Sequence, residues 1–153
     1  MREFAAAHAG VKVISNSELP PSGMNPKHHM LSLAEKHASG DILLFTDADC
    51  TVPENWISSV CRYFRNREVG LVFSSVVTVP GKGFTRRYQT FDHLLRFFYT
   101  VGAVGLGNPS GGFGNNLAVR RTALRDVGGF EGIGFSLTED AQLIAAVRNT
   151  GKW

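Results

Sequence analysis

An uninterrupted apolar segment, Ile42–Phe45 (ILLF), constrains the fold of this chain more than any other stretch. Gly40 stands before the segment, and Thr46 and two aspartates follow it, so turn-forming and polar residues bound it on both sides. A run of this kind is typical of a strand that is buried on both faces. Strands buried in this way belong to sheets that helices cover, so the segment favours an α/β domain.

The rest of the chain alternates between helix-like and strand-like segments. The residue patterns predict helices over Pro26–Ala38, Pro53–Arg65, Phe84–Ala103, Arg121–Val127 and Glu139–Asn149. They predict further strands over Val11–Ser15, Val69–Val79 and Asn116–Val119, and a glycine-rich loop over Gly102–Gly114. Because strands alternate with helices, we expect an α/β domain with a mostly parallel sheet. No repeat or low-complexity linker divides the chain, so residues 1–153 are expected to form a single domain.

Three local features add to this prediction. Asn25 and Thr138 stand directly before predicted helices, and both residue types are favoured as N-caps. The aromatic-rich stretch Phe91–Tyr99 is expected to lie in the core, with an acceptor-facing or membrane-facing surface as the alternative. The longest apolar stretch, Leu94–Leu106, is too short for a transmembrane helix and contains Arg96.

The composition excludes several classes of protein. Hydrophobic residues make up 43% of the chain and charged residues 19%, which excludes a disordered, collagen-like or coiled-coil protein. Cys50 and Cys61 are too few for a disulfide framework, so a reducing compartment is expected. The net charge is only +3 and the basic residues are scattered, so an anionic small molecule is a better expected partner than a nucleic acid.

The sharpest chemical signal is the pair of aspartates that follows the predicted buried strand. Asp47 and Asp49 would lie at the carboxyl end of that strand, the edge at which open α/β sheets bind ligands. Two carboxylates at this spacing repel one another unless a cation lies between them, which points to Mg²⁺ or Mn²⁺ and, through it, to phosphate. The alternative is that both are ordinary turn and cap residues before Pro53.

Two weaker signals follow later in the chain. Glu139 and Asp140 begin the last predicted helix, where the helix dipole favours acids, but a general base beside a cleft would occupy the same place. The segment Gly111–Arg121 (GGFGNNLAVRR) combines glycines, which let a backbone approach a ligand, with Asn115 and Asn116, which could bond hydroxyl groups. Lys27, near the start of the first long predicted helix, could meet a phosphate or could be a solvated lysine.

Taken in order, these segments resemble the family-two glycosyltransferases of the GT-A fold, which transfer a sugar from a nucleotide donor to an acceptor. The matching segments are Pro26–Asp49 with ILLFTDAD, then GGFGNNLAVRRTAL with VGGF, then TEDAQL, and together they cover about Pro26–Gly151. The resemblance implies a Rossmann-related, mostly parallel sheet flanked by helices. It also implies that strands binding the nucleotide base precede Val11 in the complete enzyme. The chain is therefore expected to be a partial GT-A catalytic domain that is incomplete at the N-terminus. Sugar transfer by this chain alone is not expected.

The resemblance also implies roles for individual residues. Asp47 and Asp49 match the DxD motif, in which the second acid coordinates Mn²⁺ or Mg²⁺ and the first contacts the donor. Asp140 matches the catalytic base of inverting members, and Glu139 supports it. The remaining implied donor-pocket or acceptor-pocket residues are Lys27, Gly112, Asn115 and Asn116.

The implied activity is inverting transfer of a sugar to a hydroxyl of a glycan, lipid or polysaccharide acceptor. The family resemblance and the long apolar helix suggest a cytoplasmic location, at the inner face of the membrane in the full-length protein. Two other readings remain open at this point. Asp47-Ala48-Asp49-Cys50-Thr51 also fits the nucleophile motif of haloacid-dehalogenase-like phosphatases, with Asp47 as nucleophile, and the chain could be a non-catalytic nucleotide-binding or sugar-binding fragment.

Overall fold

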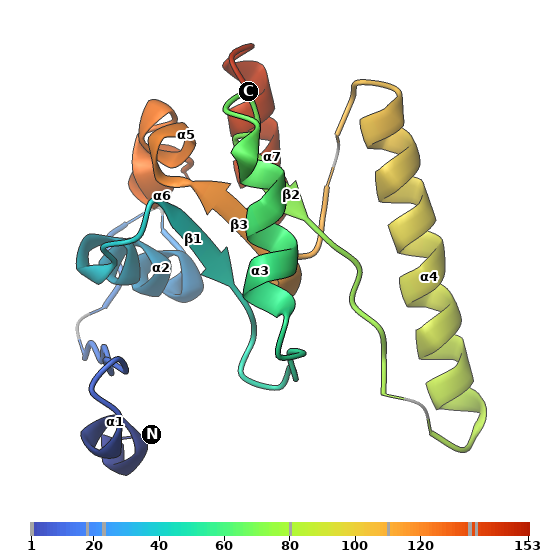
Figure 1. The fold of residues 1–153 in the computed structure, drawn as a ribbon, viewed down its shortest axis with the longest axis horizontal. Coiled ribbons are helices and arrows are strands. Elements are labelled where there is room, and N and C mark those ends of the chain that lie inside the picture. The colour runs from blue at the N-terminus through green and yellow to red at the C-terminus, as the bar shows by residue number, and fades with distance from the viewer. Residues whose placement is uncertain are drawn as a thin grey trace.

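A three-stranded sheet forms the centre of the protein (Figure 1). The structure is a computed structural model, and it describes residues 2–17, 19–22, 24–79, 81–109, 111–134, 136 and 138–153. Strand β3 (Leu117–Arg120) lies between β1 (Ile42–Phe45) and β2 (Leu71–Phe73) and is antiparallel to both. Val119 pairs with Leu43 on one side and with Leu71 on the other, which fixes the register of the sheet.

The expected mostly parallel sheet is therefore not what the described residues form. β1 and β2 run in the same direction, but they are not neighbours, because β3 lies between them and runs the opposite way. β1 lies at the edge of the described sheet, and of its four residues only Leu43 is buried, so the expected burial on both faces is met only in part. An apolar run is the same whichever way the neighbouring strand runs, so it does not predict the direction of that strand. The mixed α/β class is correct, whereas a parallel GT-A sheet is not shown.

Helices surround the sheet and were mostly foreseen within a few residues. The helical elements are α1 (Arg2–Ala7), α2 (Pro26–His37), α3 (Trp56–Cys61), η1 (Arg62–Arg65), α4 (Phe84–Gly105), η2 (Gly114–Asn116), α5 (Arg121–Asp126), α6 (Gly129–Gly132) and α7 (Glu139–Asn149). The expected cap of α2 is confirmed, since Asn25 Oδ1 accepts a hydrogen bond of 2.7 Å from the backbone N–H of His28.

The core lies on both faces of β3, whose residues alternate between the two faces. Val119 belongs to a cluster with side chains from α5, α6 and α7, including Leu124 and Leu143. Ala118 faces the other way and packs with Val60 of α3 and with Phe64. The period-two alternation of the strand thus divides the packing into two layers.

Two predicted strands are shorter or missing. Residues 11–15 adopt no regular structure, and of Val69–Val79 only Leu71–Phe73 is strand. A strand needs a neighbour for its backbone hydrogen bonds, and within the described part of the chain residues 11–15 have no strand beside them. The predicted strand over Val11–Ser15 is therefore wrong, and the one over Val69–Val79 is confirmed only for Leu71–Phe73, because pairing decides whether an apolar segment becomes a strand.

The expectation that Phe91–Tyr99 lies in the core is wrong for most of its aromatic residues. Helix α4 lies to one side of the sheet (Figure 1), and Phe91, Phe98 and Tyr99 are exposed. Its inward face is marked by Phe97, which is half-buried, and by Thr100, which is buried. Within the described residues, no helix is both long enough and apolar enough to cross a membrane.

Candidate functional site

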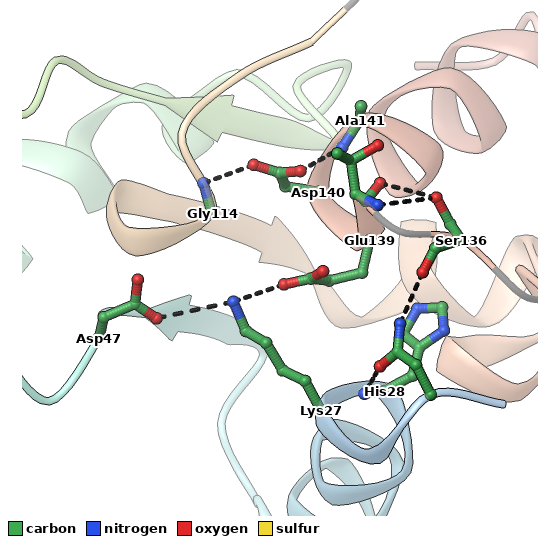
Figure 2. A network of polar contacts seen from close by, with 10 residues as sticks. Lys27, His28, Asp47, Gly114, Ser136, Glu139, Asp140 and Ala141 are labelled. Carbon is green, nitrogen blue, oxygen red and sulfur yellow. Dashed lines mark hydrogen bonds and ion pairs between the residues drawn. The ribbon is translucent and has the colours of Figure 1, made fainter. Parts of the chain in front are cut away.

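Three separate segments bring charged side chains to one place beside the sheet, and a fourth contributes a backbone N–H (Figure 2). Lys27 stands in the first turn of α2, Asp47 follows β1, and Glu139 and Asp140 begin α7. The loop before β3 contributes the backbone of Gly114. Sequence positions more than a hundred residues apart therefore form one polar network.

Lys27 is the cation at the centre of this network. Its Nζ lies 2.5 Å from Glu139 Oε1 and 3.7 Å from Asp47 Oδ1. Burial disfavours the ammonium, but the hydrogen bond to Glu139 and the charges of the surrounding carboxylates outweigh burial and raise the pKa of Lys27. Lys27 is therefore a permanent positive charge at neutral pH.

Glu139 is the more deeply placed partner of the pair. The side chain of Glu139 is 13% exposed to solvent, whereas that of Lys27 is 53% exposed. Burial alone would raise the pKa of Glu139, but the hydrogen bond from Lys27 and a backbone N–H lower it below the usual range. The carboxylate of Glu139 is therefore ionised at neutral pH and already bonded to Lys27.

Asp140 is held differently, by backbone donors. Its Oδ2 accepts a 3.0 Å hydrogen bond from Gly114 N–H, and its Oδ1 accepts a 2.8 Å bond from Ala141 N–H. A Cβ on Gly114 would lie 3.2 Å from Asp140 Cβ, so the glycine allows this close approach. The carboxylate is oriented by main chain on both of its oxygens.

The predicted Thr138 cap is not formed by its side chain. Thr138 makes no side-chain capping bond; instead its N–H donates to the Ser136 hydroxyl at 3.1 Å. Gln142 N–H bonds the carbonyl of Thr138 at 3.2 Å, which continues the helical pattern. A threonine cap would have accepted a hydrogen bond from a backbone N–H of the first turn. Here the carboxylate of Asp140 accepts such a bond, from the N–H of Ala141.

An open cleft of about 770 Å³ lies against this network. Lys27, Asp47 and Asp140 line one side of it, together with the loop residues Gly112 and Asn115. Residues of α4 line the opposite side: His93, Leu95, Arg96, Tyr99 and Thr100. The cleft thus places a fixed carboxylate and a fixed ammonium on one wall, a suitable setting for proton transfer beside an anionic group.

Asp49 lies apart from Asp47, in a second cleft of about 650 Å³. Asp49 is exposed, and its described partner is the Cys50 thiol at 3.9 Å. Asn115 and His93 line both clefts, and Asn115 Nδ2 lies 3.5 Å from Cys50 Sγ. The two acids of the predicted metal pair therefore border two adjoining spaces, joined at Asn115.

The other predicted residues of the glycine-rich segment have packing roles in the structure. Asn116 accepts a 3.0 Å bond from Trp56 Nε1 and donates a 2.8 Å bond to Ser75 O, so both ends of its amide are occupied. A Cβ on Gly112 would lie 2.6 Å from Ile144 Cδ1. Substrate contact by Gly112 or Asn116 stays a prediction, whereas their structural roles are visible.

The residues around the predicted metal pair can be compared with the ligands that a divalent cation usually takes in proteins. Among the residues that the structure describes, no three histidine, cysteine or acidic side chains gather as a metal cluster. Mg²⁺ is typically bound by one or two carboxylates together with substrate phosphates and water. Exposed Asp49, which has no ion-pair partner among the described residues, fits that pattern as one ligand.

Sequence reasoning missed the contribution of α4 to the cleft. His93 accepts or donates a long hydrogen bond of 3.4 Å with Thr78 Oγ1, and its ring lies 6.4 Å from that of Phe113. These contacts connect α4 to the segment after β2, through Thr78, and to the loop before β3, through Phe113. No spacing signal in the sequence links His93 to Asp47 or Asp140, because the pairing arises from how α4 docks.

Comparison with known families identifies the class of this protein. The family model for glycosyl transferase family 21 matches residues 1–153, and the chain belongs to that family. The expected resemblance to family-two-like glycosyltransferases is thereby confirmed, and the enzyme class is glycosyltransferase rather than phosphatase. No match to the chain was found among curated proteins or among solved structures.

Proposed function

We propose that this site performs inverting transfer of a sugar from a nucleotide-sugar donor to an acceptor hydroxyl. The observation that carries the proposal is the orientation of Asp140 by Gly114 and Ala141 on a cleft wall that also holds Lys27. A base and an anion-binding cation on one wall match the two needs of the reaction: removing a proton and stabilising a departing diphosphate.

Asp140 is the proposed general base. Its carboxylate would take the proton from the acceptor hydroxyl as that oxygen attacks the anomeric carbon. The glycosidic bond to the nucleoside diphosphate breaks as the new bond forms from the opposite face, and this single displacement inverts the configuration. Holding both substrates in one cleft supplies much of the acceleration.

Lys27, Asp47 and Glu139 are proposed to serve the donor side. Lys27 would face the diphosphate as a fixed positive charge, and Glu139 would hold the ammonium of Lys27 in place. Asp49 would coordinate Mn²⁺ or Mg²⁺, and Asp47 would contact the donor beside that metal. When bound, that cation supplies Lewis-acid stabilisation of the charge on the leaving group.

The remaining parts of the proposal concern the setting of the reaction. Gly112, Asn115 and Asn116 are proposed to border the donor and acceptor pocket. The acceptor is proposed to be a glycan, lipid or polysaccharide. We also propose that the catalytic domain has the GT-A architecture and that the enzyme works in the cytoplasm, associated with the inner face of a membrane.

Calorimetric titration tests the donor site directly. The chain is titrated with UDP, and separately with GDP, in the presence and absence of Mn²⁺. We expect binding that needs the metal and that is lost in Asp49→Asn. Glu54→Gln, which removes another exposed carboxylate a few residues away, is the matched control and should bind as the parent does. Metal-independent binding, or equal loss in both variants, would contradict the proposed site.

A further inference from the structure

The outward face of α4 is an apolar stripe that the described part of the protein leaves uncovered. Phe84, Tyr88, Phe91, Leu95 and Phe98 recur at spacings of four, three, four and three residues and so share one side of the helix, whose edge at Leu95 also borders the cleft. Their exposed fractions lie between 57% and 84%. We call these five residues the α4 stripe. Most large apolar residues that share a helix face are buried, so this stripe indicates a binding surface.

The side chains of α4 that are partly or fully buried lie on the opposite side of the helix, where it makes its few contacts with the rest of the described protein. Thr90, His93, Phe97 and Ala103 are partly buried and Thr100 is buried, at spacings that define the second face. His93 contacts Thr78 and Phe113 on that side. The α4 stripe lies on the face opposite these contacts, and its five side chains are exposed, in a helix that lies to one side of the sheet (Figure 1).

The charge beside the α4 stripe favours one kind of partner. Lys82, Arg86 and Arg87 are exposed at the start of the helix, and Arg96 lies further along it. The single acid in α4, Asp92, is already bonded to Arg96 at 2.8 Å. The surface therefore combines aromatic and aliphatic side chains with uncompensated positive charge, the composition of a helix that lies in the interface of an anionic bilayer.

A second copy of the chain fits this surface less well. It would bring the same basic residues, and α4 has no free acid to pair with them. At 22 residues, the helix is about 33 Å long, enough to lie along a membrane surface. We propose that α4 is an interfacial membrane-binding helix, which inserts the α4 stripe into an anionic lipid surface and holds the cleft beside it. The inference specifies the membrane association proposed above, and its test requires neither donor nor acceptor.

Vesicle co-sedimentation tests the proposal with the chain as it is. Vesicles of phosphatidylcholine alone are compared with vesicles that also contain phosphatidylserine, at low and high salt. We expect binding to the anionic vesicles, weakening with salt, and about a tenfold or larger loss of affinity in the double variant Phe91→Ser and Phe98→Ser. The double variant Ile57→Ser and Tyr63→Ser removes two other exposed apolar side chains and should bind as the parent does.

A second pair of variants separates the contribution of charge. Arg86→Gln with Arg87→Gln should weaken binding to anionic vesicles several-fold, whereas Arg65→Gln with Arg67→Gln, an equal charge change on another exposed segment, should not. Circular dichroism confirms that each variant is folded. Absence of vesicle binding by the folded chain, equal effects of both pairs, or dimerisation through the α4 stripe without lipid binding would overturn the proposal. Nucleotide binding that fails while vesicle binding persists would count against the donor site alone.

Discussion

Lys27 Nζ lies 2.5 Å from Glu139 Oε1, and this pair joins the first turn of α2 to the first turn of α7. Because Asp140 is the next residue along α7, the pair also fixes the start of the helix that holds the proposed base (Figure 2). The contact links residues that are far apart in sequence, and its strength should depend on the ionisation of both partners.

Replacing Lys27 with methionine should therefore lower stability in a pH-dependent way. The ammonium is half-exposed, so solvent screening limits the expected loss to about 1 kcal/mol near neutral pH. The pKa of Glu139 is lowered in the folded protein, so its contribution is present above its unfolded pKa and is lost as the pH falls through the folded value. The pKa of Lys27 is raised, so its contribution is present below its unfolded pKa and is lost as the pH rises through the folded value.

Urea unfolding of parent and Lys27→Met across the pH range checks this prediction. The difference in unfolding free energy should be largest near neutral pH and should shrink in acid, where Glu139 becomes protonated. It should also shrink in strong alkali. Lys36→Met is the control, since Lys36 forms a more exposed pair with Glu131 at 2.7 Å and should show a smaller difference. A difference that does not change with pH would mean that Lys27 stabilises the protein through packing alone.

Substituting Asp140 with asparagine should abolish transfer while preserving the fold. The amide oxygen can still accept the bond from Gly114 N–H, so the loop contact survives, but the side chain can no longer take a proton. Loss of a general base typically costs about 10²- to 10⁴-fold in rate. The measurement is the rate of sugar transfer, with donor binding and the unfolding midpoint followed in parallel.

The outcome for donor binding distinguishes the role of Asp140. If Asp140 is the base, donor affinity should change little while the rate falls. Asp126→Asn is a suitable control, because Asp126 is bonded to Lys152 and Trp153 and lies outside the residues that line the cleft. Retention of most of the transfer rate in Asp140→Asn would exclude it as the base.

Replacing Gly112 with alanine should destabilise the protein through overpacking. The added Cβ would lie 2.6 Å from Ile144 Cδ1 and 2.9 Å from the ring of Phe73, closer than the packed core allows. Overpacking of this kind costs about 1–3 kcal/mol. Gly111→Ala is the matched control, since nothing lies within 4 Å of its added Cβ. Thermal or urea unfolding measures both, and equal stability of the two variants would show that Gly112 is not packed as described.

Much of the local structure followed from the sequence. Asn25 caps α2 because its side chain can bond the N–H of His28 without any tertiary contact. Ile42–Phe45 forms a strand within its predicted bounds, because its continuous apolar run and the polar residues on either side are both local signals. The sequence likewise predicted that Asp47 and Asp49 follow the end of that strand.

Tertiary structure decided what those elements became together. The order β1-β3-β2 depends on which strands meet, so local pattern could not reveal that β3 runs against both neighbours. At the start of α7, Thr138 does not act as the cap: the N–H of Ala141 bonds Asp140 instead, and the N–H of Thr138 bonds the Ser136 hydroxyl. Phe91 and Phe98 look like core residues in sequence, since apolar type predicts burial, but burial requires a partner surface, and α4 docks through its other face.

The sequence by itself determined the residue types of the site and the segments that carry them, because helix periodicity, capping and charge are properties of neighbouring residues. Only the tertiary structure decided that Lys27 bonds Glu139 while Asp49 borders a separate cleft. Those pairings depend on distances between segments remote in the chain. Such distances are set by how side chains pack around β3, and no local pattern contains them.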